Sequence, residues 1–127
     1  MGTTMVMAFL DGDMLTVAHC GDSRCYVYSE DKELKYRTED HVKNELIVKS
    51  FFAGYPEKAI PDVKAIKVSK GDRILLCSDG LYSNVYPDIL RDRMFDDKPL
   101  DDIMDTYKFL CEKYSSDNYS GILVAIK

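Results

Sequence analysis

Apolar stretches alternate with short polar or glycine-containing turns along most of this chain. A continuous apolar run bounded by turn residues is typical of a buried β-strand, and an alternating run of a half-buried one. The pattern predicts strands at residues 5–10, 14–20, 25–28, 34–38, 63–68, 73–78 and 122–126. Of these, 5–10, 122–126 and the centre of 73–78 are predicted to be buried, and 63–68 half-buried. The first four strands follow one another within 38 residues, which predicts an antiparallel meander.

The apolar spacing becomes helical in three places. Between 40 and 52, apolar residues at 42, 46, 47 and 51 fit one helical face, with Asp40 as a plausible N-cap. A short helix is expected at 87–94, where Pro87 occupies a tolerated early position. The clearest helix is 100–114, with a stripe at i, i+3 and i+4 spacing: Leu100, Ile103, Met104, Tyr107, Leu110, Cys111 and Tyr114. We interpret this stripe as core packing.

The remaining segments contain turn residues. Turns are expected at 11–13, 29–33, 70–72 and 115–118, and a loop at 53–62. The order is therefore strands, helix, strands, two helices, strand. This order predicts an α+β fold centred on an antiparallel sheet.

Composition limits the class of protein. The chain has 127 residues, of which 46% are hydrophobic, enough for one domain with its own core. A formal charge of −5 disfavours nucleic-acid binding, which needs a basic surface. The four cysteines form no Cys-x-x-Cys pair, so we expect free thiols in a reducing compartment. No segment has the pattern of a membrane span or a signal peptide, and the expectation is a cytoplasmic protein with no membrane partner.

The sequence Ser78-Asp79-Gly80 directly follows the predicted buried strand 73–78. Glycine permits a sharp turn, including one with positive φ, immediately after the carboxylate. Asp79 is therefore expected at the mouth of a packed sheet, where a metal or a substrate can reach it. Taken alone, an Asp-Gly pair is more often an ordinary surface turn.

Two other turns repeat this design. Asp22 follows a predicted strand, and Asp117 precedes the last one. Hard divalent cations such as Mg²⁺ and Mn²⁺ prefer a few carboxylates and water, and carboxylates converging at one sheet edge supply that. Asn118 is placed to orient a neighbouring ligand. The alternative is that all three aspartates are turn residues without a ligand.

Five segments in order resemble the motifs of one known family. These are residues 2–4 (Gly-Thr-Thr), 17–24 (including Gly-Asp-Ser-Arg), 38–41 (Thr-Glu-Asp-His), 71–81 (including Ser-Asp-Gly) and 117–118 (Asp-Asn). Their order and spacing are similar to those of the metal-dependent Ser/Thr protein phosphatases, the PPM or type 2C family. The resemblance implies a β-sandwich of two antiparallel sheets flanked by helices. It also implies hydrolysis of phosphoserine and phosphothreonine in proteins by water activated between two Mn²⁺ or Mg²⁺ ions, without a phospho-enzyme intermediate.

The resemblance also implies roles for particular residues. Asp79 and Asp117 match metal ligands of the family, and Asp22 matches an aspartate that in several members helps to hold a third, weaker metal. Ser23, Arg24, Asp40 and His41 match positions that we expect to be structural, with Arg24 paired to a carboxylate and His41 hydrogen-bonded. His19 has no counterpart in the motifs and is expected on a strand face.

The sequence also departs from the family pattern. The family's upstream motifs are absent: an acidic strand, a phosphate-binding arginine, and an Asp-Gly-His-Gly turn that supplies the bridging aspartate and a proposed general acid. Asp11-Gly12 does not replace that turn, because Asp13 follows it. Ser83 lies four residues after Asp79, where many members have an acidic or amide residue, and the flap-like segment 51–62 is short. We therefore assign no catalytic side chain to this chain.

These departures imply a single, N-terminally truncated phosphatase domain over residues 1–127, with its first strands missing. The first hypothesis is a phosphatase acting on phosphorylated proteins, in which this chain alone turns over poorly or not at all. The second is a non-catalytic phosphatase-like domain that binds phosphoproteins or a partner, and the third a structural domain that binds nothing. Missing strands would leave sheet edges exposed, which predicts a homodimer or a strand swap through those edges.

Overall fold

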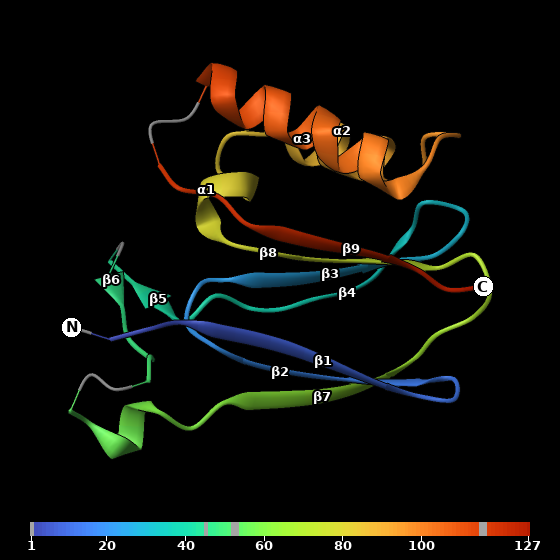
Figure 1. Cartoon of the computed structure of the whole chain (residues 1–127). Coiled ribbons are helices and arrows are strands. Elements are labelled where there is room, and N and C mark those ends of the chain that lie inside the picture. The colour runs from blue at the N-terminus through green and yellow to red at the C-terminus, as the bar shows by residue number, and fades with distance from the viewer. Residues whose placement is uncertain (1, 45, 52–53, 115–116) are drawn as a thin grey trace.

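The computed structural model describes residues 2–44, 46–51, 54–114 and 117–127. Two antiparallel sheets lie face to face, and helices cover the outer side of one of them (Figure 1). The three-stranded sheet has the order β1–β2–β7, from β1 (Met5–Asp11), β2 (Met14–Cys20) and β7 (Asp62–Lys67). The four-stranded sheet has the order β4–β3–β8–β9, from β3 (Arg24–Tyr28), β4 (Leu34–Arg37), β8 (Arg73–Cys77) and β9 (Gly121–Ala125).

The other elements are short or helical. A small hairpin pairs β5 (Val42–Lys43) with β6 (Leu46–Ile47), and a 3₁₀ turn, η1, covers Pro56–Lys58. The α-helices are α1 (Asp79–Tyr82), α2 (Pro87–Met94) and α3 (Leu100–Tyr114). None of these helices combines the length and hydrophobicity that crossing a membrane requires. The α+β class is confirmed, and the two facing sheets agree with the sandwich that the resemblance implied.

Two apolar clusters hold the layers together. Between the sheets lie Leu15, Val17, Cys25, Val27, Val68 and Ile74. Between the four-stranded sheet and the helices lie Leu75, Leu81, Leu90, Met94, Ile103 and Tyr107, with several others. The predicted stripe of α3 is confirmed as core packing through Cys111; the side chain of Tyr114 lies outside the description. The Tyr107 hydroxyl donates a hydrogen bond to the Leu90 carbonyl at 2.6 Å, which ties α3 to α2.

The predicted four-stranded meander is wrong, because the chain changes sheets after its second strand. β1 and β2 form a hairpin in the three-stranded sheet, and β3 and β4 form one in the other sheet. The crossing occurs at Gly21, whose φ of 113° is unfavourable for other residues, and a Cβ there would overlap Thr4. Motif residues 2–4 and 21–24 are therefore in contact, and Thr4 and Ser23 share a hydroxyl hydrogen bond of 2.9 Å.

The helix predicted over 40–52 is also wrong where the chain is described; residues 45 and 52 lie outside the description. The segment contains the β5–β6 hairpin, with Asn44 at a positive φ of 53°. Tertiary contacts remove the helix start: Asp40 binds Arg24 instead of capping, and the His41 amide donates to the Gly21 carbonyl at 3.0 Å. Val42, Leu46 and Ile47 are exposed, which a packed amphipathic helix would not allow.

The prediction that the strands at 5–10 and 122–126 are buried is also wrong. β1 and β9 are edge strands, so all of their residues are half-buried or exposed rather than buried. In the half-buried segment 63–68, Ile66 and Val68 pack against the core while Val63 is exposed on the other face. Of the predicted turn 115–118, residues 115 and 116 lie outside the description. All four cysteines are free and buried, as expected.

Candidate metal centre

The three predicted aspartates flank strand ends at one end of the four-stranded sheet. The strand register pairs Arg24 with Cys77 and Cys77 with Gly121. Asp22, Asp79 and Asp117 therefore lie just beyond the ends of three neighbouring strands, β3, β8 and β9. The backbone therefore places the three aspartates at the same end of the sheet, as the sequence predicted, while their role as metal ligands stays a prediction.

Hydrogen bonds hold the segments of Asp79 and Asp117 against each other. The Ser78 amide donates to the Ser120 carbonyl at 3.0 Å, and the Ser120 amide donates to the Ser78 hydroxyl oxygen at 2.9 Å. Asp117 accepts a hydrogen bond from the Asn118 amide at 2.8 Å on its Oδ1. Both carboxylates are in exposed positions, where solvent or an ion can reach them.

Gly80 has a role that differs from the prediction. It does not form a positive-φ turn but lies in the first turn of α1, which begins directly after β8. Glycine is required because a Cβ at this position would overlap the carbonyl oxygen of Asn118. The Ser-Asp-Gly and Asp-Asn motifs therefore fit together through backbone contact.

Asp22 is close enough to Asp79 for the two charges to interact. Partial burial raises the pKa of Asp22, and the negative charge of Asp79 raises it further. The Tyr82 hydroxyl, one helical turn after Asp79, donates to the Asp22 carbonyl at 2.7 Å. Two neighbouring carboxylates repel each other, and a cation between them would relieve that repulsion.

Arg24 is committed to other partners. Its guanidinium binds Asp40 through two nitrogens, with Nη2 2.8 Å and Nε 3.0 Å from the carboxylate oxygens. It also donates to the Tyr26 hydroxyl at 2.8 Å and stacks 3.6 Å above the centre of the Tyr82 ring. The predicted pairing of Arg24 with a carboxylate is confirmed. Because Asp40 takes up most of this positive charge, the Asp22–Asp79 pair is left with an excess of negative charge.

His19, His41 and Asp62 form a second group of possible ligands, with donor atoms within 4.8 Å of one another. The geometry favours a hydrogen-bonded cluster over an ion. The two imidazoles stack at 4.4 Å with planes 8° apart, and one ion cannot lie in the plane of both rings. His41 Nδ1 accepts the Gly21 amide at 2.9 Å, so its Nε2 carries the proton given to Asp62 Oδ2 at 2.8 Å.

This cluster agrees with the structural role expected for His41. His19 lies on β2 and is buried, with Nε2 2.7 Å from the Glu39 carbonyl; its Nδ1 has no partner among the described residues. The stacking joins residues 22 positions apart, so no local sequence signal predicts it. Tyr82 was also missed, although its position three residues after Asp79 is the spacing of one helical face.

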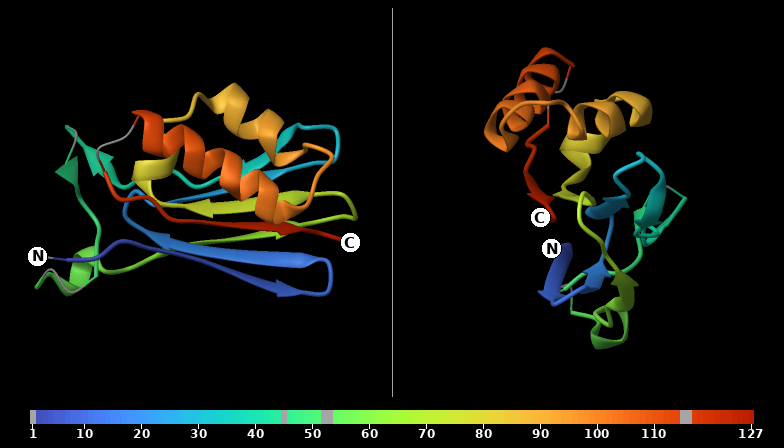
Figure 2. Two further views of the ribbon diagram at one scale, coloured as in Figure 1. Left: turned by 45° about the horizontal axis from the view of Figure 1, so that its top comes forward. Right: turned by 90° about the vertical axis from the view of Figure 1, so that its right-hand side faces the viewer.

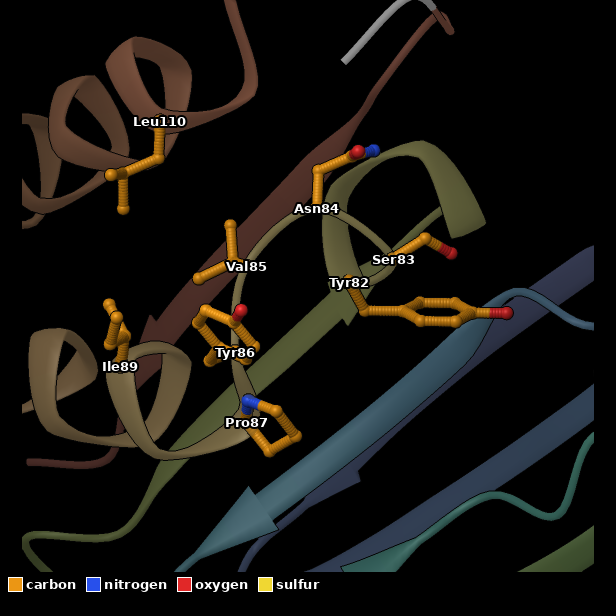
Figure 3. Close-up of a pocket in the computed structure, with 8 residues that line it drawn as sticks. All are labelled: Tyr82, Ser83, Asn84, Val85, Tyr86, Pro87, Ile89 and Leu110. Carbon is orange, nitrogen blue, oxygen red and sulfur yellow. The ribbon is translucent and has the colours of Figure 1, made fainter. Parts of the chain in front are cut away.

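An open pocket lies beside this centre, between α1, the start of α2, and α3 (Figure 3). Its volume is about 600 Å³ and it is lined mainly by apolar groups, including Val85, Ile89 and Leu110. Tyr82 lies in the pocket wall while its hydroxyl binds the Asp22 carbonyl. The pocket and the acidic centre therefore share a side chain.

Comparison with known proteins decides the family. A family model described as protein phosphatase 2C matches residues 1–122. The chain belongs to the protein phosphatase 2C family. Membership of this family also explains the order of the motifs between residue 2 and Asn118.

Curated members of the family resemble nearly all of this chain. The serine/threonine phosphatase stp of Listeria welshimeri is 29% identical over 143 residues, which cover 98% of this chain and 56% of that protein. Protein phosphatase PhpP of Streptococcus pneumoniae is 31% identical over 146 residues, covering 99% of this chain and 58% of that protein. The chain thus spans little more than half the length of these relatives.

Solved structures share the fold. The Streptococcus agalactiae serine/threonine phosphatase matches with a TM-score of 0.86 at 23% identity, covering 98% of this chain and 59% of that one. PppA of Pseudomonas aeruginosa matches with a TM-score of 0.85 at 24% identity, covering 97% and 56%. The catalytic domain of PstP, solved in complex with two manganese ions, matches with a TM-score of 0.80 at 24% identity, covering 98% and 58%.

Proposed function

We propose that this chain is part of a protein serine/threonine phosphatase that hydrolyses phosphoserine and phosphothreonine in proteins with Mn²⁺ or Mg²⁺ as cofactor. The observation that carries the proposal is that Asp22, Asp79 and the segment of Asp117 lie at the same end of the four-stranded sheet, where hydrogen bonds join the segments of Asp79 and Asp117. Membership of the protein phosphatase 2C family supports the same function.

The donor set fits hard divalent cations. Asp79 and Asp117 would hold the principal ions, and Asp22 a third, weaker one; all three offer carboxylate oxygens, the ligands that Mn²⁺ and Mg²⁺ prefer. When bound, such ions lower the pKa of water and supply a hydroxide nucleophile near neutral pH. The residues of this chain contribute negative charge and position. Gly80 lets the Asn118 backbone approach α1, and Tyr82 holds the Asp22 backbone.

The carboxylate that bridges both metals in the family has no equivalent on this chain. The one other Asp-Gly pair, Asp11-Gly12, lies in the β1–β2 hairpin. That hairpin is at the far end of β2 from Asp22, about 20 Å away along the strand. We therefore propose that the 127-residue chain holds part of a metal site, and that this chain alone turns over poorly or not at all.

A non-catalytic binding domain is the second candidate function. It is favoured by the apolar pocket of about 600 Å³ that adjoins the acidic centre through Tyr82. Such a domain would bind a phosphoprotein or another partner without hydrolysing phosphate. The two functions differ in turnover, whereas both allow metal binding.

The metal site is tested by thermal unfolding. A cation that binds only the folded chain raises the melting temperature by mass action. A stabilisation of about 1 kcal/mol corresponds to roughly 4 °C in a domain of this size. We expect Mn²⁺ to stabilise the EDTA-treated chain, and Asp79→Asn to abolish the shift. The matched control is Asp105→Asn, an equal charge change on the exposed side of α3. An equal shift in Asp79→Asn and Asp105→Asn would exclude Asp79 as a ligand.

Turnover separates the two functions. Hydrolysis of p-nitrophenyl phosphate and of a phosphothreonine peptide is measured with Mn²⁺ and with EDTA. Manganese-dependent hydrolysis that is lost in Asp79→Asn would establish that this chain is an enzyme by itself. A manganese-dependent melting shift without turnover would instead favour a partial site or a binding domain.

A further inference from the structure

The bend between β2 and β3 carries Asp22 but belongs to neither strand. β2 ends at Cys20 and β3 begins at Arg24, so the ladder hydrogen bonds of the two sheets stop short of Asp22. Gly21, directly before it, has a φ of 113° where the chain crosses from one sheet to the other. The position of the Asp22 carboxylate therefore depends on the contacts that the bend makes with other segments.

Tyr82 supplies such a contact from the helix that begins with Asp79. Its hydroxyl donates a hydrogen bond of 2.7 Å to the Asp22 carbonyl, across 60 positions of sequence. A phenol is protonated at neutral pH, so this hydroxyl is available as a donor. Figures 1 and 2 show α1 and the bend between β2 and β3 at the same end of the sandwich. One hydrogen bond therefore joins the backbone of one predicted ligand to the helix of another.

Arg24 holds the Tyr82 ring in place. The centre of its guanidinium lies 3.6 Å from the centre of the ring, a distance at which cation–π attraction acts. Asp40 binds two nitrogens of this guanidinium, and the Tyr26 hydroxyl accepts a further hydrogen bond from it at 2.8 Å. Figure 3 shows the Tyr82 side chain extending away from Val85 and the other apolar residues of the pocket. The place of the Tyr82 hydroxyl is therefore fixed by its own neighbours before any ion binds.

We propose that Tyr82 is a positioning residue for the divalent cation held by Asp22. The inference rests on the proposed metal site and adds to it a residue that is not itself a ligand. The Tyr82 hydroxyl fixes the peptide of Asp22, and with it the direction in which the carboxylate leaves the bend. Without this hydrogen bond the bend is free to adopt other conformations, and a bound cation has to order it. That ordering lowers the affinity for the cation, as in any site that is not preorganised.

The test compares Mn²⁺ binding by the 127-residue chain and its variants, measured from the electron paramagnetic resonance signal of free Mn²⁺. The component of binding that Asp22→Asn removes identifies the ion held by Asp22. Tyr82→Phe keeps the ring and removes only the hydroxyl, and should weaken this component about fivefold or more, the factor expected for one hydrogen bond. The matched control is Tyr86→Phe, the same change at an exposed tyrosine of the same pocket, which should leave the affinity unchanged. Tyr107→Phe removes a buried hydrogen bond elsewhere, and should lower the melting temperature without changing the affinity.

A second measurement needs no metal. In EDTA, hydrogen exchange at the amides of residues 21–23 should be faster in Tyr82→Phe, while exchange in β8 stays as in the unmodified chain. Three results would overturn the role of Tyr82: unchanged exchange at 21–23, Asp22-dependent Mn²⁺ binding equal to that of the unmodified chain, or an equal loss of binding in Tyr107→Phe. If Asp22→Asn removes no Mn²⁺ binding, this inference fails at its ion, while loss of binding in Asp79→Asn would still support the proposed function.

Discussion

The two sheets contain similar apolar strands but differ in what covers them. In the four-stranded sheet, β8 has Leu75 fully buried beneath α2 and α3, and the candidate metal centre lies at the end of this strand. In the three-stranded sheet, β1 exposes Phe9, and no described helix covers the outer face. Strand composition therefore does not determine burial in this molecule. The neighbours of each strand determine it, and the covered sheet is the one that positions the carboxylates.

The largest expected contrast is between Leu75→Ala and Phe9→Ala. Removing a fully buried leucine leaves a cavity and should cost about 2–5 kcal/mol of unfolding free energy. Removing Phe9 from the exposed face should change stability by about 0.5 kcal/mol or less. Urea denaturation of both variants, under conditions where the chain is monomeric, measures the difference. Equal losses would show that the uncovered face is packed after all.

Gly80→Ala tests the close contact at the metal centre. Helix propensity alone predicts that alanine in α1 stabilises the chain by about 1 kcal/mol. Overlap with the Asn118 carbonyl predicts the opposite, a loss of roughly 1–3 kcal/mol. The sign of the change in urea denaturation therefore decides between local and tertiary control. Ser83→Ala, at the end of the same helix, is the control and should be nearly neutral.

Tyr107→Phe tests how firmly the helices are attached to each other. The variant keeps the buried ring but removes the hydrogen bond to the Leu90 carbonyl. The expected loss is about 1 kcal/mol, measured by thermal or urea unfolding. Tyr119→Phe removes a hydroxyl contact to Glu112 in an exposed setting and should have a smaller effect. A larger loss in Tyr119→Phe would contradict this account of the helical layer.

The smallest effect concerns pH and lies in the uncovered sheet. The hydrogen bond from His41, aided by Lys49, lowers the pKa of Asp62 below its usual value. A lowered folded-state pKa contributes stability above the unfolded pKa near 3.8, and this contribution is lost as pH falls through the folded value. Asp62→Asn should therefore be less stable than the unmodified chain above pH 4, with the two converging in stronger acid. Melting curves from pH 3 to 7 measure this, and a constant difference would contradict it.

Local patterns predicted most elements because their causes are local. The Asp11-Gly12 turn, the stripe of α3 and the apolar centre of β8 each follow from neighbouring residues, and all are present. The prediction of a helix over 40–52 was wrong because Asp40 pairs with Arg24, which is distant in the sequence, and does not cap a helix. The sequence allowed a positive φ at Gly80 but could not show the actual reason for the glycine, which is its close contact with the Asn118 backbone.

The sequence by itself determined the α+β class, the three aspartates beside strand ends, and the family, since these depend on residue types and their order. The tertiary structure decided which sheet each strand joins, that β1 and β9 are edges, and that Asp22 lies close enough to Asp79 for their charges to interact. The physical reason is distance along the chain. Pairings such as β2 with β7 and β8 with β9 join residues tens of positions apart, and no local pattern encodes them.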